Sequence, residues 1–197
     1  MKGKFIVIEG CDFTGKSTVI EKLVNAIELG GIKPVPTKAL GGTEYGKKCR
    51  DYVMKNSGKV PNSVILDKMI KAMQDINEKI VSHAQKRGFF VICDRYYHST
   101  LVYQGMRKNA LEMVERQLSK ASLIDPDLTI ILDCDTSVIL ERMKARAETN
   151  SYDPKTAEEV DEIRNAYLEI AEMENTVMID TTNLTTENVI EKILGFI

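Results

Sequence analysis

A glycine-rich segment near the start of the chain has the residues and the spacing to hold a phosphate. Residues 10–17 read GCDFTGKS and fit the pattern G-x-x-x-x-G-K-[ST]. Glycines let the backbone curl so that several N–H groups point at one phosphate, while Lys16 can reach the β- and γ-phosphates and the Ser17 hydroxyl can ligate Mg²⁺. We therefore predict an ATP-binding loop. Its candidate residues are Gly10, Cys11, Asp12, Phe13, Thr14, Gly15, Lys16, Ser17 and Thr18.

A loop of this kind needs an acidic residue for Mg²⁺ at the end of a neighbouring strand. Asp94 follows the apolar run FFVIC, and Asp133 follows the run LTIIL. Both would lie at the carboxyl edge of a parallel sheet, where such sheets bind ligands. We favour Asp94, because Arg95 comes directly after it and places a cation at the same edge. Ser17 and Asp94 are therefore the candidate metal ligands.

Several cations fall near the predicted phosphate positions. They are Lys16, Lys38, Arg50, Arg95, Arg142 and Arg146. Phosphoryl transfer between two phosphates brings two polyanions together, which is costly unless cations lie between them. An acceptor phosphate has a second pKa of about 6, so it is ionised near neutral pH and needs positioning rather than a general base. The chain has neither an N-K-x-D guanine-reading motif nor a Ser-His-Asp arrangement, which favours a phosphate-bearing acceptor.

Apolar runs and helical stripes alternate along the chain. Short β-branched runs predict strands, and stripes that repeat every three or four residues predict helices. Strands are expected at residues 5–8, 32–37, 89–93, 128–132 and 177–179. Helices are expected at residues 17–29, 43–54, 61–87, 99–118, 136–147 and 157–173 and at the C-terminus, with a polar loop at 148–155. This alternation predicts one α/β domain over residues 1–197, with helices on both faces of a parallel sheet.

Charge and cysteine usage restrict the class of partner. The chain has 197 residues with 27 basic and 29 acidic side chains, for a net charge of −2. Proteins that grip a nucleic-acid backbone usually carry a basic excess, so we expect small-molecule nucleotides as partners and no nucleic acid. No signal peptide and no membrane-spanning apolar run is recognised, and four scattered cysteines form no C-x-x-C pair. We therefore expect a cytoplasmic protein with reduced thiols and no membrane contact.

The sequence resembles the thymidylate kinase family over nearly the whole chain, and five stretches carry the resemblance. FIVIEGCDFTGKST is similar to the family's P-loop with its preceding Glu, and PTKALGGTEYGKKCR to its T-R-E-P-G-G-T segment. ICDRYYHSTLVYQG resembles the D-R-Y-x-x-S-x-x-A-Y-Q-G signature, the most specific of the five. PDLTIILDCD resembles the strand P-D-L-T-x-x-L-D, and ERMKARAETNSYD occupies the place of the arginine-bearing lid.

The resemblance implies roles around the acceptor. Asp12 would hold the sugar 3′-hydroxyl and help to organise Mg²⁺, and Arg95 would clamp the acceptor phosphate. Tyr103 would lie against the sugar and disfavour a 2′-hydroxyl. Ser99 and Gln104 would lie beside the base.

The resemblance also implies a short lid near residues 142–155. Arg146, together with Arg142, would close over the transferring phosphoryl group. Phe13 stands where some members carry a P-loop arginine, and Ser151 where others carry a second lid arginine. The catalytic cation would then come from Arg142 or Arg146, and spacing alone does not choose between them.

Two substitutions fall on the acceptor side. Lys38 replaces an arginine of the family and gives a point charge without the bidentate fork. The family's base-reading F-x-x-x-R falls near residues 69–74, where Gln74 could bond a base edge and Met69 or Met73 could pack on its face. The candidate substrate-binding residues are Asp12, Lys38, Arg50, Met73, Gln74, Arg95, Ser99, Tyr103 and Gln104. The candidate catalytic residues are Asp12, Lys16, Arg95, Arg142 and Arg146.

The resemblance implies a P-loop three-layer α/β/α fold with a five-stranded parallel sheet, in a homodimer. The first hypothesis for function is a thymidylate kinase that uses ATP and Mg²⁺ to convert dTMP to dTDP. The second keeps the reaction but changes or broadens the base. The third is a nucleotide-binding regulatory module without turnover.

Overall fold

The fold is built on a single sheet of five parallel strands, in the order β2-β3-β1-β4-β5. The computed structural model describes residues 2–145 and 152–197. The strands are β1 (Phe5–Glu9), β2 (Pro34–Lys38), β3 (Phe90–Asp94), β4 (Leu128–Asp133) and β5 (Thr176–Asp180). Each expected strand is present within two residues of its expected bounds, and the expected α/β fold with a parallel sheet is confirmed.

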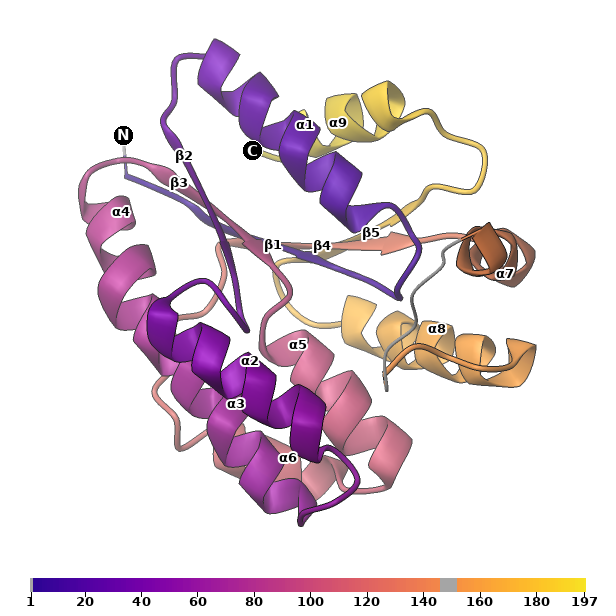
Figure 1. The fold of residues 1–197 in the computed structure, drawn as a ribbon. Coiled ribbons are helices and arrows are strands. Elements are labelled where there is room, and N and C mark those ends of the chain that lie inside the picture. The colour runs from indigo at the N-terminus through magenta and orange to yellow at the C-terminus, as the bar shows by residue number, and fades with distance from the viewer. Residues whose placement is uncertain (1, 146–151) are drawn as a thin grey trace.

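Alternate side chains of β1 pack into two separate apolar cores, one on each face of the sheet. Phe5 and Val7 belong to one apolar cluster, and Ile6 and Ile8 to the other. Because successive side chains of a strand point to opposite faces, a strand that is apolar throughout must be covered on both sides. The three layers expected from the sequence are seen in Figure 1.

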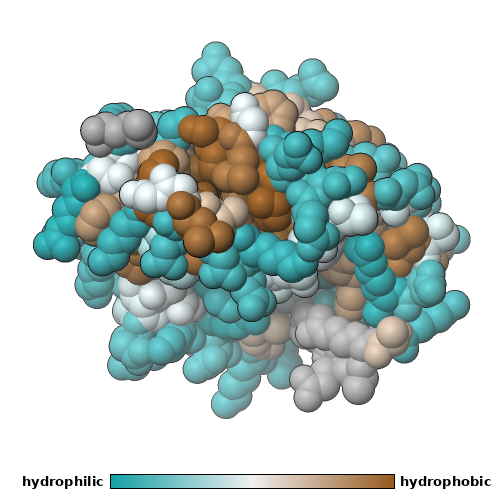
Figure 2. Space-filling view, turned by 90° about the horizontal axis from the view of Figure 1, so that it is seen from above, coloured by the Kyte–Doolittle hydropathy of each residue, from teal (hydrophilic) through white to brown (hydrophobic). Residues whose placement is uncertain are grey.

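Helices α1 (Lys16–Leu29) and α9 (Thr186–Leu194) cover one face of the sheet (Figure 1). The other helices are α2 (Glu44–Asn56), α3 (Asn62–Ile76), α4 (Ser82–Lys86), α5 (Tyr97–Thr100), α6 (Leu111–Leu118), α7 (Thr136–Ala145) and α8 (Ala157–Ala171). Figure 2 looks onto the α1 and α9 side, where hydrophilic side chains surround a patch of apolar surface. Exposed apolar side chains of these helix ends include Leu29, Leu194 and Phe196.

Two of the expected helices are interrupted by wider turns. The helix expected at 61–87 is α3 and α4 joined by a π-helical turn, η1 (Asn77–Val81). The helical region expected at 99–118 is α5, a second π-helical turn η2 (Leu101–Gly105) and α6. A 3₁₀ turn, η3 (Met106–Lys108), and the left-handed Asn109, with a φ of 49°, separate η2 from α6. An apolar stripe continues through a π turn, so the pattern alone does not reveal the extra residue.

The carboxyl ends of the central strands converge on one edge of the sheet. In the register of the sheet, Asp94 lies beside both Ile8 and Lys38. The P-loop follows β1 directly, and Arg95 follows β3. The fold therefore gathers the chemistry-bearing residues of three separate segments at the same edge. No helix within the described ranges is long and apolar enough to cross a bilayer.

Candidate active site

The P-loop leaves β1 through a turn that only glycine can make. Gly10 has a φ of 130°, and a Cβ atom there would lie 2.1 Å from the carbonyl oxygen of Leu132. Gly15, with a φ of 93°, directly precedes α1. Between them, the Thr14 hydroxyl donates to the Cys11 carbonyl at 2.9 Å, which closes the loop. A glycine-rich loop that leads into a helix N-terminus is suited to binding phosphate, as the sequence predicts for these residues.

Lys16 lies beneath this loop and is only 7% exposed. Its Nζ donates to the carbonyls of Gly10 at 3.0 Å and Cys11 at 2.6 Å. Burial, together with the nearby Arg95 guanidinium, lowers the pKa of Lys16 to about 8. The side chain is therefore a cation held at an energetic cost, which a polyanionic ligand would relieve.

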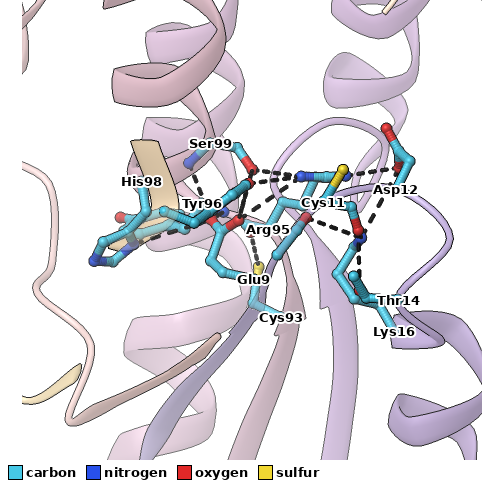
Figure 3. A network of polar contacts seen from close by, with 12 residues as sticks. Glu9, Cys11, Asp12, Thr14, Lys16, Cys93, Arg95, Tyr96, His98 and Ser99 are labelled. Carbon is cyan, nitrogen blue, oxygen red and sulfur yellow. Dashed lines mark hydrogen bonds and ion pairs between the residues drawn. The ribbon is translucent and has the colours of Figure 1, made fainter. Parts of the chain in front are cut away.

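Arg95 faces the P-loop from the neighbouring strand. Its backbone is left-handed, with a φ of 64°, and its N–H donates to the Ile8 carbonyl at 3.0 Å. Its Nη2 donates to Asp12 Oδ1 at 2.7 Å, and Lys16 Nζ lies 3.9 Å from the same oxygen (Figure 3). The two cations that should meet donor and acceptor therefore approach one carboxylate oxygen.

A cavity of about 570 Å³ joins these groups. The predicted site residues that line it are Asp12, Phe13, Gly15, Lys16, Ser17, Thr18, Lys38, Arg50, Met73, Asp94, Arg95, Ser99, Tyr103 and Arg142. Three residues of the predicted ATP-binding loop do not line the cavity: Gly10, Cys11 and Thr14. The carbonyls of Gly10 and Cys11 accept hydrogen bonds from Lys16 at the base of the loop. Arg146 lies outside the described residues.

The two candidate carboxylates for Mg²⁺ have different surroundings. Asp133 receives a bidentate contact from Arg164 of α8, with Nε to Oδ1 at 2.9 Å and Nη2 to Oδ2 at 2.8 Å. Asp94 instead lines the cavity together with Ser17. No cluster of three or more His, Cys, Asp or Glu side chains that could hold a metal occurs within residues 2–145 and 152–197. A carboxylate and a hydroxyl suit Mg²⁺ that takes its remaining ligands from phosphates and water.

Methionines line the cavity on the α2 and α3 side. Met69 and Met73 lie one turn apart on α3, and Met54 reaches the cavity from α2. Gln74 is turned away from the cavity, because its amide donates to the Ala121 carbonyl at 2.8 Å. One step along a helix rotates a side chain by about 100°, so Met73 and Gln74 cannot share a face. The structure does not bring Gln74 to the site.

Gln104 is also absent from the cavity lining. Its side chain is completely buried, and its Oε1 accepts from Lys108 Nζ at 2.6 Å. Gln104 follows Tyr103 in the π turn η2, so the two side chains leave the helix in different directions. Tyr103, in the same turn, does line the cavity.

Tyr103 presents both a ring and a hydroxyl group to this region. The Arg95 guanidinium carbon lies 5.4 Å from the ring centroid, and the ring meets that of Tyr152 edge to face at 6.1 Å. Burial raises the pKa of the Tyr103 hydroxyl, so this group stays protonated. The hydroxyl is buried and bonds no other described residue. A buried polar atom of this kind is suited to contact a ligand.

The predicted lid meets the P-loop at one described point. Arg142 of α7 donates from Nη1 to the Phe13 carbonyl at 2.9 Å and lines the cavity. This contact brings the Arg142 guanidinium against the loop of residues 10–17, and its catalytic role stays a prediction.

Two residues at the centre of the site were not predicted from the sequence. Glu9 is fully buried and accepts the backbone N–H groups of Tyr96 at 2.7 Å and Ser99 at 3.1 Å. Glu9 could have been identified from the sequence, because it is a carboxylate at the end of a strand that is otherwise apolar. Tyr167 of α8 bonds Arg95 at 2.9 Å. It lies on the apolar stripe of its helix, which gives no sign of a polar role.

Comparison with known proteins agrees with this geometry. The family model described as thymidylate kinase matches residues 8–193. The chain is 34% identical to the thymidylate kinase of Carboxydothermus hydrogenoformans, over 100% of this chain and 98% of that protein. It is 32% identical to the probable thymidylate kinase of Pyrococcus abyssi, over 100% and 97%.

A solved structure shares the fold. The thymidylate kinase of Candida albicans superposes with a TM-score of 0.77 at 22% identity, over 98% of this chain and 90% of that one. With a family match over almost the whole chain and relatives above 30% identity, this protein belongs to the thymidylate kinase family of ATP-dependent nucleoside monophosphate phosphotransferases.

Proposed function

We propose that the protein transfers the γ-phosphoryl group of ATP to dTMP and releases dTDP and ADP. The observation that carries this proposal is the approach of Lys16 and Arg95 to one oxygen of Asp12 within a single cavity. Such an arrangement lets the phosphates of donor and acceptor meet end to end between two cations. Relatives named thymidylate kinase over their full length support the choice of acceptor.

Each side chain has a distinct part in this reaction. The P-loop N–H groups and Lys16 hold the β- and γ-phosphates, and Arg95 orients the acceptor phosphate for in-line attack. Arg142 neutralises charge that develops on the transferring group. The acceptor phosphate is already ionised, so no side chain has to remove a proton from it.

Mg²⁺ would be held by the Ser17 hydroxyl and the Asp94 carboxylate, which line the same cavity. The ion supplies charge neutralisation of the phosphates when it is bound. Asp12 then has two parts: it holds Arg95 in place, and it lies where the acceptor's 3′-hydroxyl would be.

The base would lie against the methionine side of the cavity. Met69 and Met73 are buried on the long helix and offer flexible, polarisable surface in place of an aromatic face. If hydrogen bonds to the edge of the base are few, the site selects weakly between bases. This favours a second candidate, a deoxynucleoside monophosphate kinase that accepts a broader range of bases. The sugar would be read by Tyr103.

An acceptor panel tests the proposal. ADP release is measured with dTMP, dUMP, dGMP, dCMP and dAMP at equal concentration, with Mg²⁺ and ATP present. We expect the highest kcat/KM for dTMP. Equal turnover of all five would favour the broader kinase, and ATP binding without any acceptor-stimulated ADP release would favour the regulatory module.

The expectations of a homodimer and of a cytoplasmic location remain predictions. Sedimentation velocity at micromolar concentration tests the first, with a single species at twice the 22.2 kDa chain mass as the expected result.

A further inference from the structure

Two hydroxyl groups bridge the Arg95 guanidinium and the buried carboxylate of Glu9. Arg95 Nη1 donates to Ser99 Oγ at 2.9 Å and to Tyr167 Oη at 2.9 Å. The Ser99 hydroxyl donates to Glu9 Oε2 at 2.6 Å, and the Tyr167 hydroxyl donates to the same oxygen at 3.0 Å. Nη1 itself lies 3.9 Å from Oε2 (Figure 3).

The protons in this network have one consistent direction. A guanidinium can only donate, so each hydroxyl accepts from Nη1 and has its own proton to give to Glu9. The two hydroxyl oxygens also lie 3.0 Å apart, and this contact holds no proton when both protons go to Glu9. Burial raises the pKa of Tyr167 well above its ordinary value, and the neighbouring Glu9 raises it further, so the hydroxyl keeps its proton. Glu9 is fixed in turn by the backbone N–H groups of Tyr96 and Ser99 on Oε1. Both bridges therefore tie the Arg95 guanidinium to a fixed anion.

Counting donors shows what the bridges leave for a ligand. A guanidinium has five N–H groups, and Nη1 carries two of them. Ser99 and Tyr167 take both, and Asp12 takes one from Nη2. No described residue accepts from Nε. The donors that remain for a phosphate are therefore on Nη2 and Nε, the pair that can bind two phosphate oxygens at once.

We propose that Tyr167 is a positioning residue for the acceptor: with Ser99, its hydroxyl engages one nitrogen of Arg95 and so presents the Nη2 and Nε side to the acceptor phosphate. Ser99 is four residues from Arg95, whereas Tyr167 reaches it from a helix 72 residues away. Tyr167 therefore ties the clamp to α8, which the local chain cannot do. This inference rests on the proposed function, because it assigns the acceptor phosphate to Arg95.

The Tyr167→Phe variant tests it, because this change removes only the hydroxyl. KM is measured separately for dTMP and ATP, dTMP binding is measured by calorimetry without ATP, and the melting temperature is recorded. We expect KM for dTMP to rise about tenfold while KM for ATP stays within about twofold, since a bond to a charged group is lost on the acceptor side alone. Tyr97→Phe is the matched control, because its hydroxyl meets Asp125 at 3.4 Å at an exposed position.

The double variant Ser99→Ala, Tyr167→Phe removes both bridges. We expect a larger loss of acceptor affinity than either single change gives, with the ATP side again little affected. An unchanged KM for dTMP in Tyr167→Phe overturns the inference. An equal rise in both KM values with a lowered melting temperature overturns it as well, because that result describes a purely structural role.

Failure of the proposed acceptor gives a different result from failure of this inference. If the wild-type protein prefers another monophosphate, the same comparison is made with that acceptor, because the clamp contacts only the phosphate. If no monophosphate is bound or phosphorylated by the wild-type protein, both the proposed function and the inference are wrong.

Discussion

Lys16 is a buried cation that is costly to the fold, and we propose that the chemistry requires it. It is buried, its pKa is lowered to about 8, and it donates to two backbone carbonyls with Asp12 Oδ1 3.9 Å away. For Lys16→Ala we expect kcat to fall by about 100- to 1000-fold, because one charge that stabilises the transferring phosphoryl group is lost. We expect the melting temperature to be unchanged or higher. Steady-state kinetics and a thermal melt check both, and near-normal turnover would refute the P-loop assignment.

Tyr103 offers a test of sugar selection. Its ring contacts both Arg95 and Tyr152, the residue lines the cavity, and its hydroxyl is buried. For Tyr103→Ala we expect the ratio of kcat/KM for dTMP over its ribonucleotide counterpart to fall by about tenfold, because the space for a 2′-hydroxyl opens.

The companion variant Tyr103→Phe separates shape from hydrogen bonding. It keeps the ring, so we expect most of the selection to remain. The same ratio in Tyr103→Ala and in the wild-type protein would remove Tyr103 from the sugar site.

At this scale the sequence identified the residues of short motifs and missed those set by tertiary contacts. Lys16, Asp94 and Arg95 could be predicted, because each sits at a fixed distance from a strand end. Gln74 and Gln104 were expected at the site but are turned elsewhere, since helix rotation and a π turn decide their direction. Tyr167 reaches the site only because α8 packs there, and no local pattern encodes that.

At the scale of elements, the ends of β3 and β4 carry aspartates with opposite roles. Asp133 joins β4 to α8 through Arg164, and Asp94 faces the cavity beside Ser17. For Asp133→Asn we expect the free energy of unfolding to fall by about 1–3 kcal/mol, because a charged bidentate contact is lost. The Mg²⁺ concentration for half-maximal rate should not change.

Asp94→Asn should show the reverse: little change in the unfolding free energy, and a large rise in the Mg²⁺ needed for half-maximal rate. Urea titration and Mg²⁺ titration of the two variants make the comparison. A shifted Mg²⁺ requirement in the Asp133 variant alone would exchange their roles.

Strands were predictable because a short β-branched run between polar residues has few alternatives. Helix interruptions were not, because the stripe of α3 continues through η1 without a Gly or Pro to mark the change. The extra residue of each π turn is fixed by what the helix packs against.

At the scale of the whole molecule, a buried histidine links folding to pH. His98 is 1% exposed, and burial lowers its pKa to about 4. Its ring Nδ1 lies 4.0 Å from Glu9 Oε1, its Nε2 lies 3.4 Å from Thr129 Oγ1, and Asp125 acts on it electrostatically. The unfolded chain binds this proton near pH 6.5, so stability is complete above that pH and falls as the pH drops towards 4.

We expect the wild-type protein to lose on the order of 3 kcal/mol more than His98→Gln over that interval. Urea unfolding at a series of pH values gives the two slopes. Parallel slopes would show that His98 does not stay neutral in the folded protein.

The α/β architecture could be predicted from the sequence, because strands that alternate with helices along the chain usually form a parallel sheet covered by those helices. The strand order β2-β3-β1-β4-β5 did not follow, because it depends on which helices cross which face. This strand order places β1 between β3 and β4. Because Arg95 follows β3 and the P-loop follows β1, the two lie against each other.

The bonds of Lys16 to its own loop also have a consequence for how nucleotide binding exchanges protons with the buffer. A triphosphate is a stronger partner for an ammonium group than a carbonyl oxygen, so its arrival would move the pKa of Lys16 upward from about 8. Near pH 8 a fraction of the molecules would then take up a proton as ATP binds. The heat of ATP binding should therefore differ between two buffers with different ionisation enthalpies, and affinity should weaken as the solution becomes more alkaline.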